Sequence, residues 1–278
     1  MEKNIRVAQW QPQRAGEYHK ETKLDVVYGP INSRRLGLSL GINPIQGGFA
    51  CNWSCVYCQY GANSLDESLR IGKIRFSTPD EIKAGLERRL SSNEHYDSIA
   101  ICGPTEPTIS PYFNEIVDLA VEMRDRHRLR IATSLFTNAT KLSQKKLAPL
   151  DHVFMKLDAG NEETFRRFNR ARGVKYDDFV RELKEVPVKR RIIQTAVVEG
   201  NDGNLSEGNL RDYKDRIIEI KPDEIHLYPL LYKPFPEFDL RAIRREELED
   251  LSEDIESSTG VKVLTFIDPT TIGGEFRF

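Results

Sequence analysis

Three of the four cysteines lie within one eight-residue stretch, as Cys51, Cys55 and Cys58 in the spacing C-x3-C-x2-C. Three thiolates on one short loop can ligate three irons of a [4Fe–4S] cube, and the fourth iron then has no protein ligand. A structural zinc site is the alternative, but it requires four ligands, and no histidine lies near these cysteines. The spacing therefore favours a [4Fe–4S] cluster with one iron open to a small molecule.

Further polar groups stand at the ends of apolar, strand-like segments later in the chain. Lys156 and Asp158 end one such segment, and the alternation of side chains along a strand places both on the same face. Charged groups in this position are costly unless they line a site or pair with each other. The residues alone leave both interpretations open, a binding site and a mutual salt bridge. Other motifs at such ends are Gly103-Pro104-Thr105-Glu106-Pro107 and Thr137-Asn138.

Taken in order, these motifs resemble those of the radical S-adenosylmethionine (SAM) enzymes, whose hallmark is C-x3-C-x-aromatic-C. Tyr57 occupies the aromatic position of that hallmark. The similarity extends over roughly residues 25–235, and it includes residues 28–41 before the cysteines and 165–170 after them. Within the family, the chain resembles a subgroup described as wyosine-synthase-related Fe–S oxidoreductases.

The resemblance implies an α/β fold, namely a partial (β/α)6 radical SAM barrel with an N-terminal extension. The expected organisation is an extension at residues 1–24, the barrel at 25–267 and a C-terminal tail at 268–278. Two cofactors are also implied, a [4Fe–4S] cluster on Cys51, Cys55 and Cys58 and SAM on its open iron. In the family, reductive cleavage of SAM gives a 5′-deoxyadenosyl radical that abstracts a hydrogen from the substrate.

Carried onto this sequence, the family pattern assigns SAM binding to residues at the carboxyl ends of the strands. Asp158 is expected at the ribose hydroxyls and Lys156 at a carboxylate. Thr105 departs from the family form, which has glycine before the glutamate. The resemblance assigns no catalytic residue. The full set of expected SAM-binding residues is Tyr57, Gly103, Pro104, Thr105, Glu106, Pro107, Asn138, Lys156 and Asp158.

The expected substrate is an RNA base or another phosphorylated or acidic molecule, and the expected electron donor is a flavodoxin or ferredoxin. Wyosine synthases carry a second set of N-terminal cysteines, and residues 1–50 contain none, so their own reaction is not expected. Arginines at 34–35 and 166–172 predict an anion-holding rim at the barrel mouth. The alternative, in which the arginines of 166–172 pair with acidic neighbours on a solvated face, stays open.

Two other functions stay open beside a radical enzyme with its own substrate. One is a glycyl-radical-enzyme activating enzyme, although such enzymes usually show Asp-x-Lys where this chain has Lys156-Leu157-Asp158. The other is a non-catalytic Fe–S or zinc module that binds a partner. Cys102 is expected to be a small buried core residue, with a thiol hydrogen donor as the alternative.

Length and composition fit one large core, because the chain has 278 residues of which 39% are hydrophobic. The net charge of −2 neither requires nor excludes a nucleic-acid partner. No apolar run approaches the about 18 residues of a membrane span, and no secretory signal follows Met1. We therefore expect a cytoplasmic protein that does not associate with a membrane.

The order of the elements predicts a parallel sheet. Short runs rich in Ile and Val alternate with helical patterns, which implies parallel strands joined by crossovers. Thr78, Pro79 and Glu81 predict the start of a helix with Thr78 as its N-cap. Further helices are expected at 112–126, 209–220 and 245–257. Strands are expected at 38–42, 98–102, 130–135, 152–157, 192–198, 224–229 and 262–266.

Overall fold

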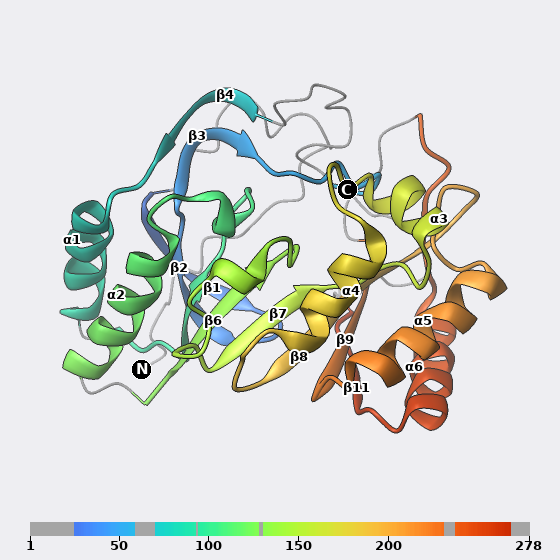
Figure 1. Ribbon diagram of the computed structural model, residues 1–278. Coiled ribbons are helices and arrows are strands. Elements are labelled where there is room, and N and C mark those ends of the chain that lie inside the picture. Colours follow the sequence, from blue (N-terminus) through green and yellow to red (C-terminus); the bar gives the residue numbers. More distant parts are fainter. Residues whose placement is uncertain (1–24, 59–69, 93, 128–129, 231–236, 268–278) are drawn as a thin grey trace.

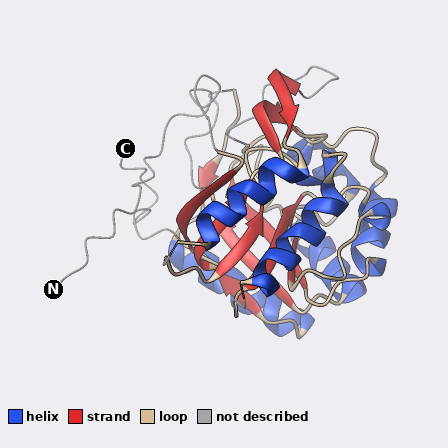
Figure 2. Ribbon diagram, turned by 90° about the vertical axis from the view of Figure 1, so that its left-hand side faces the viewer, coloured by secondary structure: helices blue, strands red, loops and turns tan. Residues whose placement is uncertain are grey.

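A mainly parallel β-sheet lies at the centre of the protein, and helices line its outer side (Figure 1, Figure 2). The computed structural model describes residues 25–58, 70–92, 94–127, 130–230 and 237–267. The strand order is β1-β2-β5-β6-β7-β8-β9-β11, and neighbouring strands from β2 onward are parallel. β1 is antiparallel to β2, while β3 and β4 form a separate hairpin. This arrangement confirms the predicted α/β partial barrel.

The bounds of the strands and helices are as follows. The strands are β1 (Val27–Ser33), β2 (Gly37–Ile42), β3 (Ile45–Ala50), β4 (Arg70–Phe76), β5 (Ser98–Ile101), β6 (Ala132–Thr137), β7 (His152–Lys156), β8 (Arg191–Glu199), β9 (Glu224–Pro229), β10 (Arg241–Ala242) and β11 (Val263–Thr265). The helices are α1 (Pro79–Leu90), α2 (Phe113–Arg126), α3 (Glu162–Thr164), α4 (Tyr176–Glu185), α5 (Glu207–Ile220) and α6 (Arg245–Thr259), with 3-10 turns η2 (Pro107–Ile109) and η3 (Leu142–Gln144) and the π-helical turn η4 (Phe165–Asn169).

The seven strands expected from the sequence are all present, and only β6 is clearly displaced, because it begins at Ala132 and runs to Thr137. The predicted start of α1 is also confirmed. Thr78 accepts a hydrogen bond from the backbone N–H of Glu81 at 3.3 Å, and the Glu81 carboxylate accepts one from the Thr78 N–H at 2.9 Å. Both bonds satisfy N–H groups that a helix start otherwise leaves without partners.

Several elements were not predicted. β1 and the β3–β4 hairpin lie around the cysteine segment, and α4 precedes β8. Tyr176, Phe179, Val180 and Leu183 are the buried residues of α4. Their spacing of i, i+3, i+4 and i+7 is a helical signal that was present in the sequence. The connection from β6 to β7 holds only the short turn η3, where the other crossovers carry an α-helix.

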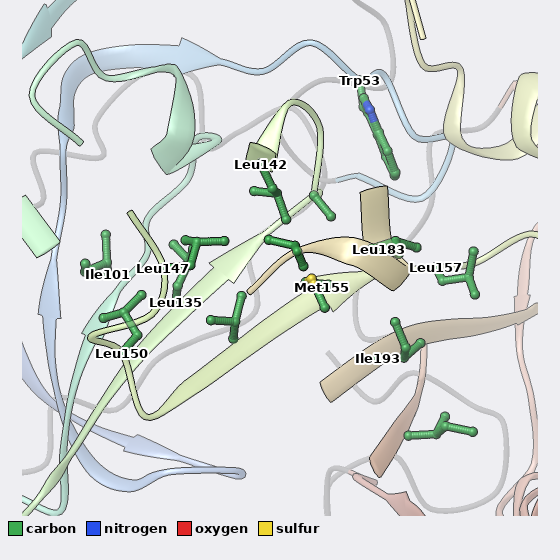
Figure 3. Packing of buried hydrophobic residues seen from close by; sticks show 14 of the residues in the cluster. Trp53, Ile101, Leu135, Leu142, Leu147, Leu150, Met155, Leu157, Leu183 and Ile193 are labelled. Carbon is green, nitrogen blue, oxygen red and sulfur yellow. The ribbon is translucent and has the colours of Figure 1, made fainter. Parts of the chain in front are cut away.

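The two faces of the sheet differ in chemistry. Leu135, Met155 and Ile193 on neighbouring strands belong to the main apolar core (Figure 3). The residues next to them in sequence, Lys156 and Gln194, are opposite each other on β7 and β8 and line a cavity on the inner face. Because side chains alternate along a strand, apolar packing outside leaves the inner face to polar and aromatic groups.

The two edges of the sheet approach each other at one place. The guanidinium of Arg34, just after β1, donates a hydrogen bond to the carbonyl of Phe266, just after β11, at 3.3 Å. This hydrogen bond links the β1 edge of the sheet to the β11 edge. Among the described helices, none combines the length and apolar character needed to cross a membrane. The predicted extension at 1–24 and tail at 268–278 lie outside the described residues.

Candidate active site

The cysteine segment is anchored by a buried tryptophan. Trp53 is 2% exposed, and its indole N–H donates to Thr140 Oγ1 at 2.9 Å. Its ring meets Phe165 edge-on at 5.2 Å between centroids and Phe179 at 5.4 Å. These contacts combine large apolar burial with one satisfied polar group. Trp53, which lies between Cys51 and Cys55 and is labelled in Figure 3, therefore fixes the segment to η4 and α4 through these two rings.

Backbone hydrogen bonds hold the same segment against the turn η4. The N–H of Ser54 donates to the carbonyl of Asn169 at 3.3 Å, and the N–H of Val56 donates to the carbonyl of Phe168 at 2.9 Å. The N–H of Arg172 in turn donates to the carbonyl of Asn52 at 3.3 Å. The cysteine segment thus pairs with the chain that follows β7, although the two are far apart in sequence.

Amide groups point at two of the three cysteine sulfurs. Asn138 Nδ2 lies 3.5 Å from Cys51 Sγ, and the N–H of Trp53 donates to the same sulfur at 3.4 Å. Asn169 Nδ2 lies 3.5 Å from Cys55 Sγ. Donors of this kind stabilise thiolate ligands and tune the potential of a cluster.

Without a bound metal, the sulfurs of Cys51 and Cys55 favour the thiol form. Burial raises the pKa of Cys55 to about 12 and raises that of Cys51 as well. Metal binding must then displace these protons. In the described part of the chain, no three or more His, Cys, Asp or Glu side chains gather as they would around one ion. A cube differs, because each cysteine ligates a separate iron. The donor set therefore fits a cluster.

A cavity of about 280 Å³ brings most of the predicted site residues together. Pro107 and Asp158 do not line it, and Cys102, Phe136 and Gln194 line it although they were not predicted to bind SAM. The predicted residues that do line it are Cys51, Cys55, Tyr57, Cys58, Gly103, Pro104, Thr105, Glu106, Asn138 and Lys156. Their individual roles toward a cluster or SAM stay predictions.

Glu106 ties the ends of β5 and β6 together. Its buried carboxylate accepts hydrogen bonds from the Thr108 N–H and hydroxyl at 3.1 and 2.7 Å. It also accepts from the Thr137 hydroxyl and the Asn138 N–H, both at 2.7 Å. Burial raises the pKa of Glu106, and these hydrogen bonds act in the opposite direction. The side chain thus fixes the loop that carries Asn138 to the cavity wall.

Asp158 is the junction between β7, β8, η4 and the cysteine segment. Its side chain is fully buried, and Oδ2 accepts from the Tyr57 hydroxyl at 2.8 Å and from Asn169 Nδ2 at 2.7 Å. Oδ1 accepts from the Ala196 N–H at 2.7 Å and lies 3.0 Å from Lys156 Nζ. All four contacts come from the protein itself. The expected contact with a ribose stays a prediction, and it requires some of these bonds to be exchanged.

Lys156 forms the salt bridge that the sequence left open. Besides Asp158, its ammonium donates to the Tyr228 hydroxyl and lies 4.4 Å from the centre of that ring. Burial lowers the pKa of Lys156, but Asp158 and Tyr228 outweigh it, so the pKa is raised. The ammonium is therefore charged and already neutralised by a carboxylate. Its expected contact with a SAM carboxylate stays a prediction.

The arginines of the predicted anion-holding rim occupy different places. Arg166 donates to the carbonyls of Ala171 and Val174 at 3.0 and 2.6 Å and pairs with Glu162. Arg167 donates to two backbone carbonyls that follow β8. These guanidinium groups support loops of the protein. The predicted rim at the barrel mouth is an untested expectation, and these contacts give it no support.

Two residues make contacts at the site that the sequence did not predict. Asn169 contacts both Cys55 and Asp158, and its motif at residues 165–170 had been interpreted mainly for its arginines. Cys102 lines the cavity, and its sulfur lies 3.1 Å from the Tyr28 hydroxyl. Burial raises the pKa of Cys102 to about 11, so it is a thiol at neutral pH. It is only partly buried, and both interpretations of its role stay open.

Relatives in sequence cover most of this chain. A protein named GTPase Obg from Brachyspira hyodysenteriae is 28% identical over 246 residues, which are 85% of this chain and 34% of that protein. A UPF0026 protein of Methanocaldococcus jannaschii is 29% identical over 153 residues, 53% of this chain and 44% of the relative. The chain thus spans less than half of either. A UPF0026 protein of Synechocystis is 25% identical over 269 residues, 87% of this chain and 96% of its own length.

Similar solved structures share the fold at low identity. A structure of TYW1 with a lysine-pyruvate adduct has a TM-score of 0.60 at 14% identity, covering 81% of this chain and 74% of that one. A radical SAM methyltransferase from Sphaerobacter thermophilus has a TM-score of 0.61 at 16% identity, covering 83% and 66%. The structure described as anSMEcpe with bound AdoMet has a TM-score of 0.55 at 18% identity, covering 82% and 63%.

One family matches more than half of the sequence. The family described as Radical SAM superfamily matches residues 45–202, a stretch that includes the cysteine segment and the ends of strands β5 to β8. The fold, the cavity and this match agree with the resemblance inferred from the motifs. The chain belongs to the radical SAM superfamily.

Proposed function

We propose that the protein is an enzyme that cleaves SAM reductively and uses the radical produced to remove a hydrogen from its own substrate. The observation that carries this proposal is the shared cavity. Cys51, Cys55 and Cys58 line it together with residues from the ends of β5, β6 and β7. Function at the carboxyl ends of parallel strands is the rule for barrels of this kind.

The cysteines would hold the cluster, and the other lining residues would position SAM. A [4Fe–4S] cluster on Cys51, Cys55 and Cys58, with SAM on its open iron, would supply the electron that yields a 5′-deoxyadenosyl radical. The amides of Asn138 and Asn169 support two of the ligand sulfurs by hydrogen bonds. The predicted SAM-binding set keeps its assignment, with Asp158 and Lys156 holding Tyr57 and the strand ends in place.

Anaerobic reconstitution with iron and sulfide tests the metal assignment. We expect about four irons per chain and a loss of the cluster absorption in Cys51→Ser, Cys55→Ser and Cys58→Ser. Cys102→Ser is the matched control, because Cys102 lines the same cavity but lies outside the triplet; it should keep all its iron. Stoichiometric zinc with no iron uptake would support the binding-module alternative instead.

The proposal for the substrate names a chemical class and no single compound. An acidic or phosphorylated molecule, with an RNA base as one class, follows from the family resemblance, and a flavodoxin or ferredoxin would supply the electron. Reductive cleavage of SAM by reconstituted protein would separate an enzyme from a partner-binding module. Hydrogen transfer from a large protein to the 5′-deoxyadenosyl radical, which leaves a radical on that protein and yields 5′-deoxyadenosine, would favour the activating-enzyme alternative.

A further inference from the structure

Arg35 is a cation on the inner face of the barrel with unusual neighbours. It lies in the β1–β2 turn, and its guanidinium donates to the side-chain oxygen of Gln194 on β8 at 2.8 Å. Its central carbon lies 4.7, 5.4 and 5.7 Å from the ring centres of Tyr228, Phe266 and Phe136. Aromatic faces attract a guanidinium and hold its plane, but they do not neutralise its charge.

No carboxylate of the described residues forms an ion pair with this guanidinium. Burial is the largest influence on it and lowers the pKa of Arg35 to about 10, so the group is still charged at neutral pH. A desolvated cation without a counter-ion is costly. A guanidinium has five N–H donors in a planar fork, and its hydrogen-bonding partners among the described residues, Gln194 and Tyr228, leave donors for a ligand.

The neighbours of Arg35 connect it to the active-site cavity. Phe136, Gln194 and Tyr228 contact the guanidinium and also line the cavity that the cysteines share. The neighbouring cation, Lys156, is 3.0 Å from Asp158 and therefore already neutralised. Arg35 is not itself a lining residue of this cavity, but it contacts three residues that are, and among the described residues no carboxylate pairs with it. We name Arg35, Gln194, Phe136 and Tyr228 the Arg35 site.

We propose that the Arg35 site binds a carboxylate group of the substrate, which rests on the proposed function of the cavity. A carboxylate matches the guanidinium fork with two parallel hydrogen bonds and carries the one negative charge that Arg35 can balance. A phosphate monoester, which is a dianion, would leave one charge unbalanced in a cavity that also contains the buried carboxylate of Glu106, and a phosphodiester, although a monoanion, is bulkier than a carboxylate. The substrate class is therefore a small carboxylic acid.

Calorimetric titration of the full chain tests this site without turnover. The probes are pyruvate, succinate, benzoate and inorganic phosphate, each with SAM present and at constant ionic strength. We expect one of the carboxylates to bind wild type, and Arg35→Gln to weaken it by about ten- to a hundredfold, since a charge-assisted pair is lost. Arg34→Gln is the matched control, because it removes the same charge from the same turn at an exposed position; its binding should not change.

Each other outcome overturns the proposal in a distinct way. Equal or tighter binding of phosphate at Arg35 contradicts the choice of a carboxylate. Weaker SAM binding in Arg35→Gln, with carboxylate binding unchanged, shows that the guanidinium serves the cofactor. If Arg35→Gln does not fold, Arg35→Lys keeps the charge but loses the fork, and unchanged carboxylate binding there counts against the site. If the wild-type protein binds iron and cleaves SAM but binds none of the carboxylates, only the Arg35 site is refuted. If the wild-type protein does not bind iron, the proposed function is refuted.

Discussion

Buried charge is handled differently in two parts of one cavity. Around the cysteine segment, the carboxylates of Glu106 and Asp158 each have four protein donors, and Lys156 has a carboxylate at 3.0 Å. At the Arg35 site, the guanidinium has a neutral amide and aromatic rings. Nearby, His226 Nδ1 is buried without a hydrogen-bond partner among the described residues.

The contrast separates two uses of polar residues in a barrel interior. A buried group with every hydrogen bond satisfied by the protein fixes the positions of its neighbours. A buried group whose hydrogen bonds or charge the protein does not satisfy lowers stability unless a ligand supplies the missing partner. Three substitutions test whether a given polar group fixes its neighbours or is available to a ligand. They follow in order of expected effect.

Removing Asp158 should have the largest effect on stability. Asp158→Ala takes away the acceptor of Tyr57 and Asn169 and leaves Lys156 buried without a counter-charge. We expect the free energy of unfolding, measured by urea denaturation, to fall by about 3–5 kcal/mol. Asp118→Ala, which breaks an exposed pair with Lys146, should cost less than about 1 kcal/mol.

The opposite result for Asp158 would change its role. If Asp158→Ala is as stable as wild type but binds SAM more weakly, the carboxylate serves the cofactor directly. In that case, the assignment of Asp158 to SAM binding is supported, and a buried polar group near the cysteines also serves a ligand.

His226 should give the protein a distinct pH dependence. Burial lowers the pKa of His226 from 6.5 to about 4, so between these values the unfolded chain binds a proton that the folded chain does not. Stability is therefore complete above pH 6.5 and decreases as the pH falls to 4, by at most about 3 kcal/mol. Glu224 adds to the loss at the acid end, because its pKa is also lowered.

Urea denaturation of His226→Gln between pH 4 and 7.5 isolates this contribution. The variant should show a flatter slope than wild type, since its side chain does not titrate. An unchanged slope in His226→Gln would mean that folding does not lower the pKa of the imidazole.

Arg166 should have the smallest effect of the three. Arg166→Ala removes hydrogen bonds to the carbonyls of Ala171 and Val174, so we expect a loss of about 1 kcal/mol in the free energy of unfolding. Arg245→Ala, which breaks an exposed helical pair, should cost less. RNA binding with a salt dependence that Arg166→Ala flattens, at unchanged stability, would instead support the anion-holding rim predicted from the sequence.

The parts of the site that the sequence predicted depend on short-range patterns. The cysteine spacing, the strand ends and the capped start of α1 each lie within a few residues, so their geometry follows from local rules. Lys156 and Asp158 were expected on one face for the same reason. The sequence allowed either a ligand-binding role or a mutual salt bridge for them, but it could not decide between the two.

The parts that it missed depend on contacts between distant segments. Arg34 and Arg35 were named together as part of an anion-holding rim, but nothing in a run of two arginines shows that one lies inside the barrel and the other outside, and the contact of Arg35 with Gln194 spans 159 residues. The contact of Asn169 with Cys55 spans 114 residues. Tertiary packing decides such positions, whereas the helix α4 could have been found from its periodicity alone.

The pairing of the cysteine segment with η4 has a consequence for biosynthesis. Ser54 and Val56 are held by carbonyls that the ribosome adds more than a hundred residues later, at Phe168 and Asn169. While the first half of the chain emerges, the three thiols have no fixed arrangement and are open to oxidation and to unrelated metals. We therefore expect iron delivery to succeed only after translation has passed η4, so that a nascent chain stalled before residue 165 would not retain a cluster.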